Sequence, residues 1–163
     1  INISIIQLLK PNFINRLFEL IDEMQINPKN IGIEITESVF ASNYDNINHI
    51  IEKLREAGIY IAIDDFGTGY SSLSRETELK VDYMKIDKYF IDRLLSANLN
   101  KVITRDIISI SHKLGQCTIA EGVEQDIQLQ YLKENNCDKI QGYLISKPLD
   151  EEDAIKFLKS KNI

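Results

Sequence analysis

The chain has 163 residues, of which 44% are hydrophobic and 27% are charged, so it can bury the core of one globular domain. Its net charge of -6 argues against the clustered positive surface that binds DNA or RNA duplexes. Its apolar runs are only a few residues long, and its start, INISIIQLLK, lacks the features of a signal peptide. We therefore expect a cytoplasmic domain without membrane contact.

Short β-branched runs alternate with longer amphipathic stretches along the chain. Strands are predicted at residues 1–5, 31–35, 59–63, 81–86, 117–121 and 139–144. Helices are predicted at residues 11–25, 44–57, 125–135 and 151–159, and at 89–114 with a break near Asn98 and Asn100. A strand followed by a helix, repeated along the chain, indicates parallel strands with crossover helices and an α/β fold.

The alternation of side chains along each predicted strand separates an apolar face from a polar one. Ile31, Ile33 and Ile35 share a face that should pack on helices, and Glu34 lies opposite them. The carboxyl ends of parallel strands meet at one rim, and ligands of α/β proteins bind there. Polar groups near this rim should therefore converge. They are Asn2, Glu34, Asp64, Asp65, Lys85, Glu121 and Gln141.

Asp64 and Asp65 are adjacent like charges at the end of a predicted strand, which is costly unless a cation holds them. Carboxylate and amide oxygens, with no His or thiolate among them, suit hard cations such as Mg²⁺ or Mn²⁺. Two ions about 4 Å apart could share the aspartates and stabilise a phosphoryl displacement. Lys85 could then activate a water or neutralise a phosphate. For the pair by itself, the alternative is a solvated turn or a helix cap.

Six segments, in this order and spacing, resemble the EAL-domain family of bacterial cyclic di-GMP phosphodiesterases. They are NIS, EITES, DDFGTGYSSL, VDYMKID, AEGVE and QGYLISKPL, and the resemblance covers essentially the whole chain. It implies a TIM-type (β/α)8 barrel that uses two divalent cations, Mg²⁺ or Mn²⁺, to hydrolyse cyclic di-GMP to the linear guanylyl dinucleotide. It also implies a homodimer, in which the FGTGYSS loop links dimerisation to metal binding.

The resemblance further implies roles for single residues. The implied metal ligands are Asn2, Glu34, Asp64, Asp65 and Glu121. The implied catalytic residues are Lys85, which would activate the water, and Glu121 near the second metal. Gln141 resembles a position that contacts substrate or water, whereas Tyr143 is either barrel packing or a guanine contact. The implied supporting residues are Glu37, Glu124 and the loop residues Gly67, Thr68 and Gly69.

About six of the eight βα units of such a barrel are present in this chain, so the front of the barrel is missing. The Glu-Ala-Leu motif that names the family normally precedes the NIS segment. We therefore expect residues 1–163 to be an N-terminally incomplete EAL phosphodiesterase domain, with sensory domains upstream in the full protein. One alternative is a catalytically inactive EAL domain that senses cyclic di-GMP or mediates protein contacts. Another is a different metal-dependent TIM-barrel hydrolase, which requires the match to be accidental.

Overall fold

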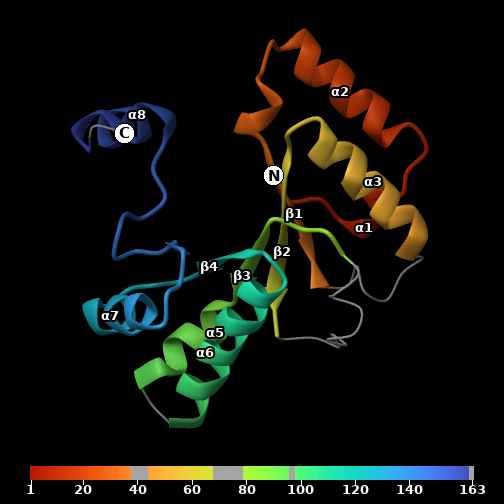
Figure 1. The fold of residues 1–163 in the computed structure, drawn as a ribbon. Coiled ribbons are helices and arrows are strands. Elements are labelled where there is room, and N and C mark those ends of the chain that lie inside the picture. Colours follow the sequence, from red (N-terminus) through yellow and green to blue (C-terminus); the bar gives the residue numbers. More distant parts are fainter. Residues whose placement is uncertain (38–43, 68–78, 96–97, 162–163) are drawn as a thin grey trace.

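The computed structural model describes residues 1–37, 44–67, 79–95 and 98–161. Within these residues, parallel strands form one sheet in which neighbours along the chain are neighbours in space (Figure 1). The strands are β1 (Gly32–Thr36), β2 (Tyr60–Phe66), β3 (Tyr83–Ile86), β4 (Cys117–Ala120) and β5 (Lys139–Ile140). This order is that of a TIM-barrel wall, so the sheet is part of such a barrel.

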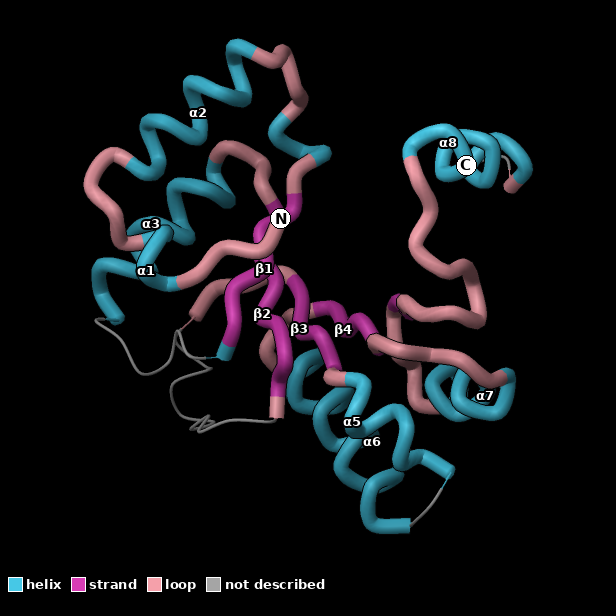
Figure 2. The backbone as a smooth tube through the Cα atoms, turned by 180° about the vertical axis from the view of Figure 1, so that it is seen from behind, coloured by secondary structure: helices cyan, strands magenta, loops and turns pink. Residues whose placement is uncertain are grey.

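Helices precede β1, follow β5 and, in the described residues, connect β1 to β2, β3 to β4 and β4 to β5. They are α1 (Ile5–Leu8), α2 (Phe13–Glu23), α3 (Tyr44–Glu56), α5 (Lys88–Asp92), α6 (Asn98–Lys113), α7 (Asp126–Glu134) and α8 (Glu151–Ser160), with 3₁₀ turns η1 (Pro28–Asn30) and η3 (Arg93–Leu95). α3 packs on β2, and α6 packs on β3 and β4. Figure 2 shows α8 apart from the strands, at the end of an extended connection. In the described part of the chain, no helix combines the length and hydropathy that a membrane crossing requires.

The predicted apolar face of the sheet forms the core. Ile33 and Ile63 have no exposed surface, and they face Ile47 and Leu54 of α3, which are equally buried. Burying one such side chain contributes about 1.5–3 kcal/mol to the free energy of unfolding. The opposite face of β1 is only partly buried at Glu34. The parity prediction is therefore confirmed, and the polar face is left for the site.

The strand predicted at residues 1–5 is mostly wrong. Asn2 makes an isolated parallel bridge with Glu34, so the start of the chain does run beside β1. The pairing stops because Ser4 caps α1, and its Oγ accepts a hydrogen bond from the Gln7 N–H at 3.3 Å. A capping box of this kind starts a helix. The backbone of Asn2 nevertheless lies beside that of Glu34, and its role as a metal ligand stays a prediction.

The strand predicted at residues 139–144 is also too long, since β5 covers only its first two residues. At Gly142 the backbone comes close to the segment that follows β4. A Cβ atom on Gly142 would lie 2.2 Å from the Val123 carbonyl oxygen, so only glycine fits there. The predicted helix at residues 89–114 is divided as expected, but α6 already begins at Asn98, so the break comes earlier than predicted.

Two aspartates at the amino ends of strands fasten neighbouring elements. Asp82, just before β3, accepts a hydrogen bond from the Ile61 N–H of β2 at 2.9 Å. Its other carboxylate oxygen accepts two hydrogen bonds from the guanidinium of Arg55, at 3.0 and 2.8 Å. Because Arg55 lies in the last turn of α3, Asp82 ties this helix to the edge of two strands. Both donors of Arg55 converge on one oxygen of Asp82, and such charge-assisted hydrogen bonds are stronger than neutral ones.

Asp138 repeats this arrangement just before β5. Its Oδ2 accepts hydrogen bonds from the N–H and the hydroxyl of Thr118 in β4, at 2.7 and 2.9 Å. The same oxygen lies 2.8 Å from Nε2 of His112 near the end of α6. Burial by itself would raise the pKa of Asp138, but the bonds from Thr118 and the neighbouring His112 outweigh it and lower the pKa. The ionised form of Asp138 therefore stabilises the fold.

We predict that Asp138→Ala lowers the free energy of unfolding by about 1–3 kcal/mol at pH 7, because the fully buried Thr118 loses its acceptor. A carboxylate with a lowered pKa stabilises above its unfolded pKa, and this contribution is lost as pH falls through the folded pKa. The difference from wild type should therefore shrink below about pH 4. Urea unfolding at several pH values checks this. Asp106→Ala, at an exposed position of α6, is the control, and an equal effect there would contradict the prediction.

Candidate active site

Several of the polar side chains predicted at the carboxyl rim converge there. The contributing elements are successive strands, which supply Glu34 from β1, Asp64 from β2, Lys85 from β3 and Glu121 from the position after β4. The register aligns their ends, since Thr36 pairs with Asp64 and Ile86 pairs with Ala120. The four side chains therefore meet on the polar face of one sheet edge.

Lys85 lies at the centre of this cluster and is only 4% exposed. Its Nζ lies 2.7 Å from Glu34 Oε2, 3.0 Å from Asp64 Oδ1 and 2.7 Å from Glu121 Oε1. Burial by itself would lower the pKa of Lys85, but the hydrogen bonds to these carboxylates outweigh it and raise the pKa above its ordinary value. Lys85 is therefore a fixed cation at neutral pH, surrounded by an excess of carboxylates.

The carboxylates are not fully compensated by this one ammonium. Burial raises the pKa of Glu121 against the opposing attraction of Lys85, and the charges of Asp64 and Glu34 add to the rise. A raised carboxyl pKa means that the surrounding protein disfavours the ionised form of the group. A second cation at this rim would therefore relieve the repulsion.

Asp65 is placed differently from the prediction, which puts it just past the strand. β2 continues to Phe66, and Asp65 lies inside the strand with a φ of 57°. The pairing of β2 with β3 shifts between Ile63 and Phe66, as at a β-bulge. The bulge turns Asp65 so that its N–H donates to Asp64 Oδ1 at 3.1 Å. Burial raises the pKa of Asp65, and the charges of Asp64 and Asp87 raise it further.

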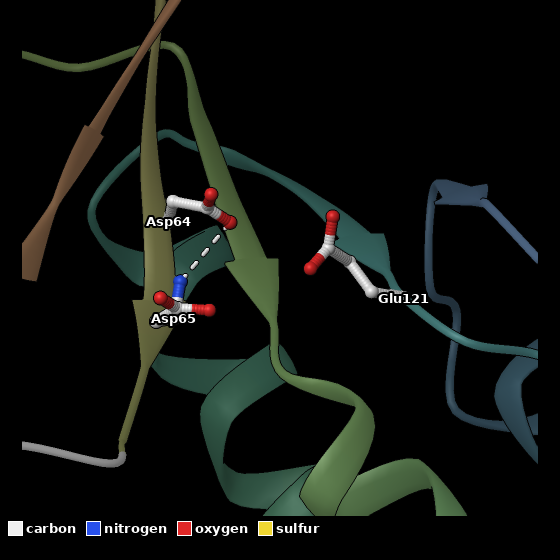
Figure 3. A group of neighbouring side chains, drawn as sticks. All are labelled: Asp64, Asp65 and Glu121. Atoms are coloured by element: carbon white, nitrogen blue, oxygen red, sulfur yellow. Dashed lines mark hydrogen bonds between the residues drawn. The ribbon is translucent and has the colours of Figure 1, made fainter. Parts of the chain in front are cut away.

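Oxygen atoms of Asp64, Asp65 and Glu121 all lie within 4.8 Å of one another. Figure 3 shows the two aspartates on one strand and Glu121 beyond the neighbouring strand. The Asp64 carboxylate points toward Glu121. The donor set is entirely oxygen, which suits a hard divalent cation. Burial and neighbouring carboxylates raise the pKa of both Asp65 and Glu121, and a cation at this position would offset these effects.

Gly67, the first residue of the loop after β2, is held by contacts with Glu37 and with α5. The Gly67 N–H donates to Glu37 Oε2 at 3.3 Å, in agreement with the predicted role of Glu37. Gly67 has a φ of 93°, and a Cβ atom there would lie 2.8 Å from the ring of Phe90. The backbone at Gly67 therefore rests directly on α5. Thr68 and Gly69, the other loop residues predicted to matter, lie outside the described residues.

Glu124, Gln141 and Tyr143, which are also predicted as site residues, make other contacts in the structure. Glu124 Oε1 accepts a hydrogen bond from Lys88 Nζ at 2.9 Å. The backbone N–H of Gln141 donates a hydrogen bond to the Ala120 carbonyl at 2.8 Å. Tyr143 is 57% exposed, which argues against a packing role within the described chain. Their contacts with substrate stay predictions.

Three further residues are functional candidates, although the sequence pattern does not indicate them. Asp87 lies close enough to Asp65 to raise its pKa, and it also accepts a hydrogen bond from the Tyr89 N–H at 2.7 Å. Lys88 follows it and reaches Glu124. Gln128 of α7 is a buried polar side chain. The alternation of side chains could have indicated Asp87, because it is two residues after Lys85 and so falls on the same face. No sequence pattern marks Gln128, which lies in a helix.

Comparisons with known proteins agree on one family. A family model described as EAL domain matches residues 1–148. The signaling protein YkoW of Bacillus subtilis is 38% identical over 158 residues, which are 97% of this chain and 20% of that protein. The cyclic di-GMP phosphodiesterase NbdA of Pseudomonas aeruginosa is 40% identical over 130 residues, which are 80% of this chain and 17% of that protein. The chain thus spans about a fifth of the length of these curated relatives.

A solved structure agrees with this assignment of the fold. The PaMucR phosphodiesterase in complex with c-di-GMP superposes on this chain with a TM-score of 0.87 at 31% sequence identity. The superposition covers 94% of this chain and 62% of that one. The parallel sheet and its carboxyl rim therefore have a counterpart in a protein that binds a cyclic dinucleotide.

We predict that Lys85→Met lowers the free energy of unfolding by about 3 kcal/mol in EDTA, because it leaves three partly buried carboxylates without their cation. Added Mn²⁺ should raise the melting temperature of the variant more than that of the wild type. Thermal melts with EDTA and with Mn²⁺ measure both effects. Lys156→Met, which removes an exposed ion pair, should cost less than about 0.5 kcal/mol. Equal melts of the two variants would contradict the prediction.

Proposed function

Because the chain belongs to the EAL domain family, we propose that its site hydrolyses one phosphodiester bond of cyclic di-GMP and releases the linear guanylyl dinucleotide. The observation that carries the proposal is the convergence of Glu34, Asp64 and Glu121 on Lys85, beside Asp65. A phosphodiester is an anion, and its hydrolysis builds up charge on oxygen that such a site can neutralise with cations. The names of relatives such as NbdA support this substrate.

Two divalent cations, Mg²⁺ or Mn²⁺, are part of the proposal. The residues that would hold them are Asn2, Glu34, Asp64, Asp65 and Glu121. When bound, such ions lower the pKa of water and offset negative charge on the attacking and leaving oxygens. Asp64 lies between its neighbours Asp65 and Glu34, so it is the residue best placed to serve both ions. Its Oδ1 already contacts Lys85, which competes for the same carboxylate.

Lys85 and Glu121 would have different roles in the proposed reaction. Lys85 keeps its proton at neutral pH, so it donates hydrogen bonds and orients a water or a phosphate oxygen rather than removing a proton. Glu121 Oε1 lies 2.7 Å from Lys85 Nζ, so it is placed to accept the proton that the attacking water loses. The water oxygen bonds to phosphorus, the bond to one sugar oxygen breaks, and that oxygen takes up a proton.

Gln141 and Tyr143 would bind the nucleotide at the edge of the site. The exposed ring of Tyr143 can stack on a guanine base. Lys147 Nζ lies 5.9 Å from the centre of this ring and adds positive charge where a phosphate can approach. Glu37 would support the loop that follows β2, and Glu124 would support the site through its ion pair with Lys88.

We also propose the wider setting of the domain. The much greater length of its relatives supports upstream sensory domains in the full protein. A homodimer and a cytoplasmic location complete the proposal. The alternative is an EAL domain that binds cyclic di-GMP, or a partner protein, without hydrolysis. The intact set of charged residues in the described part of the site favours hydrolysis.

We predict that Asp64→Asn in the complete domain lowers turnover of cyclic di-GMP at least about a hundredfold and weakens activation by Mn²⁺, because it removes the shared ligand. Turnover measured over a Mn²⁺ titration checks this. Asp22→Asn, at an exposed position of α2, is the control. Normal turnover of Asp64→Asn at ordinary Mn²⁺ concentrations would sink the two-metal proposal. Binding of cyclic di-GMP without turnover by the wild type would favour the sensor alternative.

We predict that Tyr143→Ala raises KM for cyclic di-GMP about tenfold with little change in kcat, since stacking of a base on an aromatic ring contributes about 1–3 kcal/mol. Tyr143→Phe keeps the ring and should restore KM to within about twofold. Steady-state kinetics of the two variants measure both values. If Tyr143→Ala leaves KM unchanged, the ring does not contact the substrate.

A further inference from the structure

The segment between β4 and α7, residues 121–125, carries two acidic residues of the proposed site. Glu121 contacts Lys85, and Glu124 pairs with Lys88. The segment belongs to no helix or strand of the described structure, and Gly122 has a φ of 67°. Its conformation therefore depends on the groups that hold it from either side.

Backbone contacts hold this segment on the side of β5. The Val123 N–H donates to the Gln141 carbonyl at 3.1 Å, and the Leu144 N–H donates to the Val123 carbonyl at 3.0 Å. Val123 has no exposed surface, and Gly142 allows the two backbones to approach. These bonds fix the middle of the segment against β5.

Gln128 holds the segment on the side of α5. This α7 side chain is 2% exposed, and its Oε1 accepts hydrogen bonds from the Glu124 N–H at 2.8 Å and the Gln125 N–H at 3.0 Å. Its Nε2 donates to the Ile91 carbonyl of α5 at 3.1 Å. One buried amide thus joins the acidic segment to α5.

α5 in turn follows the centre of the site along the chain. It begins at Lys88, directly after Asp87, and Lys85 precedes both. The Lys88 side chain lies across Gly122, where a Cβ atom would be 2.3 Å from its Cγ. Anything that ties α5 to residues 121–125 therefore limits how far Glu121 can move from Lys85.

We propose that Gln128 is a positioning residue for the proposed hydrolysis, and the inference rests on that function. Gln128 sets the place of the Glu121 and Glu124 carboxylates relative to Lys85 by joining their backbone to α5. It touches neither substrate nor metal. Buried groups that orient ligands in this way typically change metal affinity or activity about 10- to 100-fold when they are replaced.

The competing explanation is that Gln128 only caps α7. Gln128→Glu separates the two roles, because a carboxylate still accepts the Glu124 and Gln125 N–H groups and suits the first turn of a helix. The same change removes the donor to the Ile91 carbonyl. A pure cap therefore predicts unchanged kinetics, whereas positioning predicts a damaged site in a folded protein.

The experiment compares wild type, Gln128→Glu and the control Gln130→Glu, which makes the same change at an exposed position of α7. We expect Gln128→Glu to lower kcat at least about tenfold and to weaken Mn²⁺ binding at least about fivefold, with KM for cyclic di-GMP within about twofold. Mn²⁺ binding is measured by electron paramagnetic resonance without substrate. Thermal melts show that the protein is folded. Values of kcat and Mn²⁺ affinity equal to those of the control would overturn the proposal.

A second variant covers the case in which Gln128→Glu does not fold. Gln128→Asn keeps a neutral amide but shortens the side chain, so it cannot reach the segment and α5 together. We expect it to lower kcat and Mn²⁺ affinity as well, and unchanged values would overturn the proposal. If the wild type binds Mn²⁺ but does not hydrolyse cyclic di-GMP, the proposed function fails by itself. The Mn²⁺ affinities of the variants then still decide the role of Gln128.

Discussion

The structure depends on one buried ammonium held among three carboxylates. Lys85 sits on the central strand β3, and its contacts with Glu34, Asp64 and Glu121 reach the strands that flank β3 on either side. Without this cation, the carboxyl rim would bring like charges together at the edge of a core, which is costly. The same arrangement leaves the rim short of positive charge, because one lysine faces several acids. Stability and affinity for further cations therefore have a common origin.

Charge also organises the opposite edge of the sheet, in a way that serves the fold alone. Asp82 joins β2 to Arg55, and Asp138 joins β4 to His112. In both cases the aspartate stands just before a strand and accepts from the backbone of the preceding strand. These contacts fix the register of neighbouring βα units. The carboxyl rim carries the separate charged cluster around Lys85.

The acidic residues of the site differ in how they are held. Glu34 and Asp64 project from strands, so the sheet itself sets their positions. Asp65 owes its direction to a bulge, and Glu121 lies on an irregular segment. Positions of the second kind need support from neighbouring helices. In this chain Asp87, just before α5, lies near Asp65, and the amide of Gln128 on α7 joins residues 121–125 to the Ile91 carbonyl of α5.

The sequence by itself determined the order of the strands, the apolar face of Ile33 and Ile63, and the convergence of acids at one rim. These features follow from side-chain alternation, which is local. The tertiary structure alone decided where strands end, since Ser4 capped a helix and Gly142 met the backbone of a distant segment. It also decided the three partners of Lys85 and the hydrogen bonds of Gln128. Such contacts depend on register and on packing between elements, which no local pattern encodes.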